Sequence, residues 1–119
     1  MRKVSSTNYT NQKAITEGCP ITSTMTMIGG RWKLAIIWHL RNGALRYNEI
    51  MKSIPGISEK MLIQQLKELI KSGWVIKKDF REIPPRTEYR LTKTGESFTP
   101  ILKSIYSWGM KNNIMEATK

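Results

Sequence analysis

The chain has 119 residues, with 20 Lys and Arg against 9 Asp and Glu, a formal net charge of +11 at pH 7. This excess favours a polyanionic partner such as a nucleic acid, with an anionic membrane surface as the competing interpretation. The length suits one domain with a modest core, and the sequence shows neither an apolar run of roughly 18 residues nor a metal or phosphate-loop motif. A single cysteine excludes an internal disulfide framework.

The N-terminal part begins with a polar stretch, residues 1–18, which predicts an arm outside the folded domain. Proline is favoured at the first position of a helix, so Cys19 before Pro20 is the expected cap. A thiol at a helix N-terminus has a lowered pKa, which makes Cys19 a candidate redox sensor, although most free cysteines are small packing residues. The helix after it carries a narrow apolar stripe of Ile21, Met25 and Ile28 and ends at a glycine pair.

Two further helices are predicted before the centre of the chain. Residues 31–40 are apolar nearly all round, which indicates the buried central helix, and His39 within it is interpreted as a core residue. Residues 45–54 predict a shorter helix with four side chains available for burial. Pro55-Gly56 then provides a tight turn. The four side chains are Tyr47, Ile50, Met51 and Ile54.

A helix over residues 58–72 has both ends marked, with Ser58 as N-cap and Gly73 in the left-handed conformation. Short helix, turn and capped helix follow the helix-turn-helix order, in which the second helix enters the major groove. Gln can bond adenine, and Lys can bond guanine or phosphate, although an ordinary solvated face has the same composition. One face carries Leu62, Leu66, Leu69 and Ile70; the other carries Lys60, Gln64, Lys67 and Lys71, with Glu68 at its edge.

Residues 74–80 and 87–91 have the composition and alternation of strands, and Pro84-Pro85 between them marks a stiff hairpin tip. Arg81 and Arg86 at its base suit a wing that presses cations onto phosphate or into a minor groove. A solvated hairpin is the alternative. The predicted fold is mainly α with a small β-hairpin wing (α+β), a winged helix-turn-helix.

The last helix carries an apolar stripe too large to leave in water. Pro100 must lie in its first turn or produce a kink. Because a winged helix already has its own core, we expect this helix and the N-terminal helix to pair with a second chain, rather than to fold back. The expected organisation is an arm over 1–18, a domain over 19–111 and a tail over 112–119. The stripe consists of Phe98, Ile101, Leu102, Ile105 and Trp108.

Several motifs in order resemble those of the HxlR-type winged-helix transcriptional regulators, which are related to the MarR family. They are Cys19-Pro20, Gly29-Gly30-Arg31-Trp32-Lys33, residues 45–50, residues 54–62, residues 84–89 and residues 91–95. The resemblance implies a homodimeric bacterial regulator in the cytoplasm, with dimer contacts from the terminal helices. It also implies that a cysteine at the Cys19 position can sense oxidants or electrophiles.

The candidate site therefore has three parts and no convergent catalytic set, cofactor or metal, so no enzyme is predicted. The expected partners are duplex DNA with an inverted-repeat operator and a second copy of the chain; a small-molecule effector is left open. A winged-helix module for RNA or protein is the alternative. The DNA-binding candidates are Arg46, Ser58, Lys60, Met61, Gln64, Gln65, Lys67, Arg81 and Arg86; the dimerisation candidates are Ile21, Met25, Ile28, Phe98, Ile101, Leu102, Ile105 and Trp108; the redox-sensing candidate is Cys19.

Overall fold

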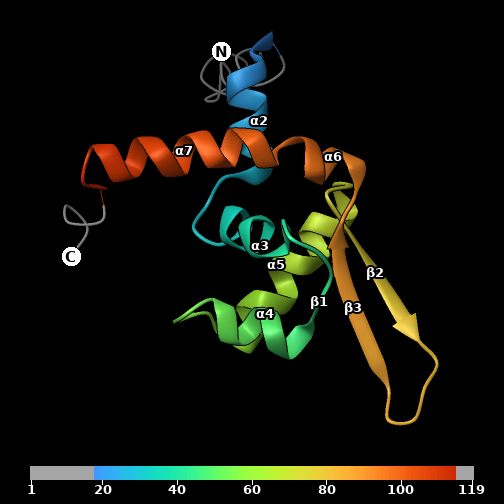
Figure 1. Ribbon diagram of the computed structural model, residues 1–119. Helices are drawn as coiled ribbons and strands as arrows, with labels where there is room; N and C mark the ends of the chain where they lie inside the picture. Colours follow the sequence, from blue (N-terminus) through green and yellow to red (C-terminus); the bar gives the residue numbers. More distant parts are fainter. Residues whose placement is uncertain (1–17, 115–119) are drawn as a thin grey trace. The chain divides into compact units, whose positions relative to one another are not determined.

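The computed structural model describes residues 18–114 (Figure 1), so the expectations for most of the arm and for the end of the tail lie outside the described residues. The chain divides into two compact units, residues 1–31 and 32–119. In the first unit, α2 spans Pro20–Ile28, with Cys19 as N-cap and Gly29 as C-cap. Both predicted ends of this helix are confirmed.

The second unit has the element order of a winged helix-turn-helix followed by a terminal helix (Figure 1), which confirms the predicted fold class. Its sheet is antiparallel, with the strand order β1-β3-β2. The elements are α3 (Lys33–Leu40), β1 (Leu45–Arg46), α4 (Tyr47–Ser53), α5 (Glu59–Lys71), β2 (Val75–Phe80), β3 (Arg86–Leu91), α6 (Lys93–Ser97) and α7 (Thr99–Lys111).

Helix α3 is the centre of this unit, as its composition predicts. Ile36 and Ile37 are fully buried, and the helix contacts α4, α5, α7 and β3. It begins at Lys33, two residues later than expected, with Trp32 as the N-cap. Burial lowers the pKa of His39, and the positive charge of Arg41 lowers it further, so this imidazole is neutral near pH 7.

The prediction of a helix from residue 45 onward was wrong for its first two residues. Leu45 and Arg46 form β1, in which they pair with Tyr89 and Glu88 of β3. Helix α4 begins only at Tyr47, because Arg46 is extended. The backbone N–H of Arg46 donates to Glu49 Oε1 at 2.7 Å. The backbone partners of Leu45 and Arg46 lie on the free edge of β3, more than 40 residues away in the sequence. Helical spacing alone cannot reveal such a pairing.

Helix α5 has the predicted ends. Ser58 Oγ accepts a hydrogen bond from the Met61 N–H at 3.0 Å, and Gly73 has a φ of 85°. The leucines at positions 62, 66 and 69 are buried. Ile70, which the helical spacing places on the same face, is 36% exposed. It lies beyond the core-facing edge of the stripe, beside a surface cavity described below.

A threonine joins the end of α5 to α6. The hydroxyl of Thr92 donates to the Gly73 carbonyl at 2.6 Å and accepts from the Gly95 N–H at 3.2 Å. A Cβ at Gly95 would lie 2.4 Å from the Trp74 carbonyl oxygen, so only glycine allows this close approach. These contacts fix the chain where it leaves the wing.

Helix α7 packs on α3 through part of its surface. Pro100 lies in its first turn, one of the two predicted places. Leu102 is only 5% exposed, and the ring of Tyr106 stacks on Trp38 with centroids 5.2 Å apart. One member of the predicted dimer stripe, Leu102, thus already belongs to the core of a single chain.

Candidate nucleic-acid interface

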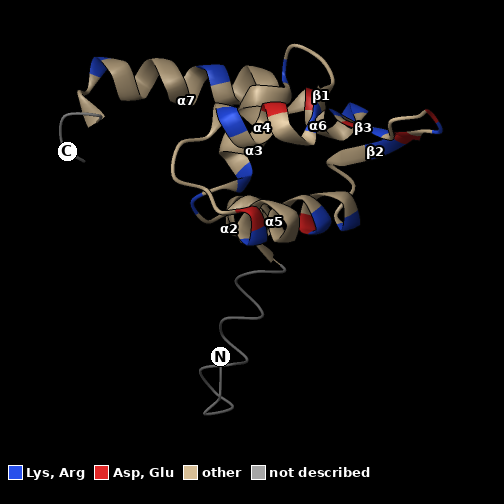
Figure 2. Cartoon of the chain, turned by 90° about the horizontal axis from the view of Figure 1, so that it is seen from below, with Lys and Arg blue, Asp and Glu red and all other residues tan. Residues whose placement is uncertain are grey.

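The face of α5 opposite its buried leucines is exposed and polar. Glu59 in its first turn is also exposed, where a carboxylate interacts favourably with the helix dipole. Lys and Arg recur along α5 and along the wing (Figure 2). These two elements follow one another in the sequence, and both carry positively charged side chains. The exposed side chains are Lys60, Gln64, Lys67 and Lys71, as predicted.

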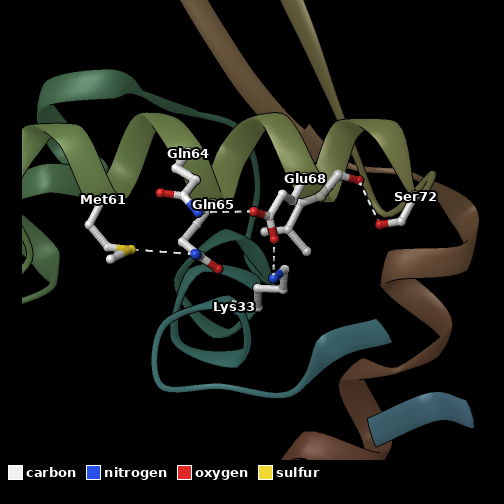
Figure 3. A network of polar contacts seen from close by, with 7 residues as sticks. Lys33, Met61, Gln64, Gln65, Glu68 and Ser72 are labelled. Carbon is white, nitrogen blue, oxygen red and sulfur yellow. Dashed lines mark hydrogen bonds and ion pairs between the residues drawn. The ribbon is translucent and has the colours of Figure 1, made fainter. Parts of the chain in front are cut away.

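A polar network holds one of these side chains in place (Figure 3). Lys33 Nζ lies 2.6 Å from Glu68 Oε1, and Gln64 Nε2 donates to Glu68 Oε2 at 3.2 Å. The hydrogen bond from Lys33 is the main cause of the lowered pKa of Glu68, and the bond from Gln64 and the charge of Lys33 add to it. Helical spacing predicted Glu68 only at the edge of this face and could not reveal Lys33, which lies 35 residues away on α3.

Some other DNA-binding candidates on and just before α5 are partly buried or already hydrogen-bonded. Gln65 Nε2 contacts Met61 Sδ at 3.4 Å, and both residues are partly buried (Figure 3). The oxygen of Ser58 accepts the capping bond, which leaves its hydroxyl proton to donate. Arg46, at the end of β1, is exposed. Gln64, Lys60 and Lys67 are therefore the most accessible of the α5 candidates.

The two wing arginines differ in their surroundings. Arg86 Nη2 lies 2.9 Å from Glu82 Oε2, and its Nε lies 3.9 Å from Glu88 Oε2. The guanidinium carbon of Arg86 also lies 3.8 Å from the ring centroid of Phe80. Arg81 is exposed at the end of β2. Arg81 is thus the more accessible of the two for a phosphate.

A cavity of about 330 Å³ lies between α5 and the sheet. The Tyr47 hydroxyl is buried there, and within residues 18–114 it has no hydrogen-bond partner. Burial raises the pKa of Tyr47, and the negative charge of Glu59 adds to the shift. From its helical spacing Tyr47 was predicted only to be available for burial, and Lys77 had no predicted role. The lining consists of Tyr47, Ile63, Leu66, Lys67, Ile70, Lys77 and Tyr89.

Cys19 has the lowered thiol pKa that its position predicts. The side-chain hydrogen bond from Thr22 is the largest cause, followed by the backbone N–H groups of Thr22 and Ile21. Residues of the first turn thus favour the thiolate through local hydrogen bonds. The contribution of the Thr22 hydroxyl was not anticipated from the sequence.

The candidates for dimerisation fall into exposed and buried groups. In α2, Ile21 is 76% exposed and Met25 51% exposed, whereas Ile28 is buried. In α7, Ile101 and Ile105 are about half exposed and Trp108 is 61% exposed. Phe98 is partly buried and contacts the Trp74 ring edge to face, with centroids 5.3 Å apart.

Residues 18–114 contain no group of three or more His, Cys, Asp or Glu side chains placed to hold a metal ion. Among the helices described, none has the length and apolar character needed to cross a bilayer.

The fold and the exposed face of α5 define a winged helix-turn-helix protein of the DNA-binding class. The model of the HxlR-like helix-turn-helix family matches residues 27–117, and the chain belongs to this family. The HTH-type transcriptional regulator YdeP of Bacillus subtilis is 39% identical over 95 residues, which span 80% of this chain and 74% of YdeP. The family consists of transcriptional regulators, which are not an enzyme class.

Solved structures agree with this assignment. A MarR-family transcriptional regulator from Porphyromonas gingivalis W83 is 46% identical, with a TM-score of 0.78, over 81% of this chain and 94% of that one. The redox regulator HypR in its oxidised form is 36% identical, with a TM-score of 0.74, over 78% of this chain and 96% of that one. The family named by the resemblance is thereby confirmed.

Proposed function

We propose that two copies of this cytoplasmic regulator bind an inverted-repeat operator, with α5 of each copy in a major groove and each wing on the adjacent backbone or minor groove. The main support for this proposal is the arrangement of side chains on the two faces of α5. Its buried leucines fix the helix to the core, while Lys60, Gln64 and Lys67 remain exposed on the opposite face. Two equivalent helices would reach successive major grooves about 34 Å apart.

Within this arrangement α5 would read bases and the wing would bind phosphate. Loss of Gln64 or Lys60 should change discrimination between sites by about 1–3 kcal/mol for each lost base contact. Arg81 in the wing would contribute affinity that depends little on sequence. Lys67 and Lys77, which line the cavity beside Tyr47, offer two further cations between these elements.

The alternative is a module for RNA or for a protein partner, since a winged helix does not fix its ligand. The experiment is a gel-shift competition in which labelled random-sequence duplex DNA is displaced either by the same DNA without label or by RNA duplexes of the same length. We expect the unlabelled DNA to displace the probe at a concentration at least tenfold lower than the RNA. Equal competition by RNA, or no binding of either, would reject the proposed partner.

The proposed dimer rests on the exposed part of the α7 stripe. Ile101, Ile105 and Trp108 leave a contiguous apolar face on a helix whose other side packs on α3. Exposed apolar patches of this kind mark protein contacts. An inverted-repeat operator is matched by a dimer with two-fold symmetry. The exposed face of α7 would therefore support both the proposed dimer and its binding to the operator.

We propose further that Cys19 makes DNA binding sensitive to oxidants or electrophiles. Its lowered pKa increases the thiolate fraction, and the structural neighbour HypR is a redox regulator. The chain has one cysteine, so oxidation by diamide would remove two hydrogens from two thiols and join two chains, or join one chain to a small thiol. An electrophile would form an adduct on Cys19 instead.

The test is to titrate DNA binding with diamide, and separately with an aldehyde electrophile, for wild type and for Cys19→Ser. We expect wild type to change affinity after treatment and Cys19→Ser to remain unchanged. Equal responses of the two proteins, or no response from wild type, would leave Cys19 as a packing residue.

A further inference from the structure

We infer that Glu68, anchored by Lys33, is a positioning residue that fixes the amide of Gln64 and thereby sets the base preference of α5. This inference rests on the proposed function, in which Gln64 contacts bases. It gives Glu68 and Lys33 a role in base recognition that neither the sequence pattern nor the similarity to known regulators assigns to them. Glu68 would act through Gln64 and would not itself contact DNA.

The geometry shows why Glu68 can hold another side chain still. Gln64 and Glu68 are four residues apart on α5, so their side chains are neighbours on the helix surface. Such a pair alone is weak and mobile. Here Lys33 Nζ lies 2.6 Å from Glu68 Oε1, which leaves Oε2 to accept from Gln64 Nε2 at 3.2 Å (Figure 3). Lys33 is the first residue of α3 and its side chain is only 13% exposed, so the anchor comes from the core helix.

The chemistry of the carboxylate decides which end of the amide faces it. An ionised carboxylate only accepts hydrogen bonds, whereas the Gln amide has a donor end and an acceptor end. The lowered pKa of Glu68 keeps it ionised near pH 7. The NH₂ group of Gln64 therefore faces Glu68, and the carbonyl oxygen with the second N–H remains available to a ligand.

This orientation matters for reading DNA. Adenine presents an N6 donor and an N7 acceptor in the major groove, and a Gln amide matches them with its oxygen and one N–H. A fixed amide presents this pair in one order, whereas a free amide also samples the flipped order. Anchoring by Glu68 should thus sharpen the preference for adenine at the position that Gln64 contacts.

The experiment measures relative affinities for all four bases at each position of a duplex selected from random DNA. The position of Gln64 is the one at which Gln64→Ala changes the preference. The main variant is Glu68→Gln, whose amide can accept from or donate to Gln64 and so permits both orders. Glu59→Gln is the matched control, because it removes the same charge from the first turn of α5, away from Gln64. Thermal unfolding checks that each variant is folded.

We expect Glu68→Gln and Lys33→Met to reduce the adenine preference at that position about threefold to tenfold, part of the effect of losing a bidentate contact. Preferences elsewhere should stay unchanged, and Glu59→Gln should alter only overall affinity. Lys33→Arg should retain most of the preference, since it can still bond the carboxylate. In the Gln64→Ala background, Glu68→Gln should have no further effect on base preference.

Three results would overturn the inference, and they are distinguishable. If Gln64→Ala changes the preference at one position and Glu68→Gln leaves it as in wild type, Glu68 does not position Gln64. The same holds if the effects of the two substitutions simply add. If Gln64→Ala changes no preference at any position, the proposed base-reading role of Gln64 fails, and the inference fails with it.

Discussion

Removal of Trp108 should weaken the proposed dimer strongly. The residue is 61% exposed on α7 in a single chain. A tryptophan has about 200 Å² of surface to bury, so roughly 120 Å² would remain for an interface. At about 25 cal/mol per Å², this burial stabilises by about 3 kcal/mol for each side chain, or about 6 kcal/mol for two. Even if half of this is lost to ordering and imperfect packing, Trp108→Ala should raise the dimer Kd about 100-fold.

Sedimentation equilibrium over nanomolar to millimolar protein measures this Kd directly. Ile83→Ala is the matched control, because Ile83 at the wing tip is fully exposed and lies outside α7. It should leave the dimer Kd unchanged. The proposed α7 interface would be excluded if Trp108→Ala dimerised as tightly as wild type, or if wild type itself sedimented as a monomer at micromolar concentration.

Three further predictions test other parts of the structure. Thr92→Val should lower the free energy of unfolding by about 1–2 kcal/mol in urea titrations, because two hydrogen bonds are lost, while Thr92→Ser should retain most of it. Because the pKa of Glu68 is lowered from 4.5, its stabilisation is present above that value and lost as the pH falls through the lowered one. The difference in unfolding free energy between wild type and Lys33→Met should therefore shrink below pH 4.5, and a constant difference would contradict this. Arg81→Ala should reduce the salt dependence of DNA binding by about one unit of slope, and Arg86→Ala by less, because Arg86 is already paired with carboxylates. Equal slopes for the two variants would show that this pairing does not matter.

Local signals were sufficient to predict α5 and the wing. The cap at Ser58, the positive φ at Gly73 and the spacing of the buried leucines are all set within one stretch of sequence. The hairpin is equally local, because β2 and β3 are consecutive and pair from Val75–Leu91 to Phe80–Arg86. Elements of this kind can be derived from spacing and turn chemistry alone.

Contacts between distant segments could not be predicted in this way. β1 exists because β3 offers an open edge, and Lys33 meets Glu68 because α3 and α5 pack together. Leu102 has the spacing of an interface residue but is buried in the single chain. Helical spacing shows that a face is apolar, but only the fold shows which neighbour covers it.

In the proposed function, two α5 helices read an operator with two-fold symmetry. The most direct measurement is to select bound sequences from random duplex DNA with the full chain and to align them. We expect an inverted repeat whose half-sites are about 10 base pairs apart from centre to centre. We also expect Gln64→Ala to relax the preference at symmetry-related positions in both halves. Selected sequences without two-fold symmetry would rule out the proposed mode of binding.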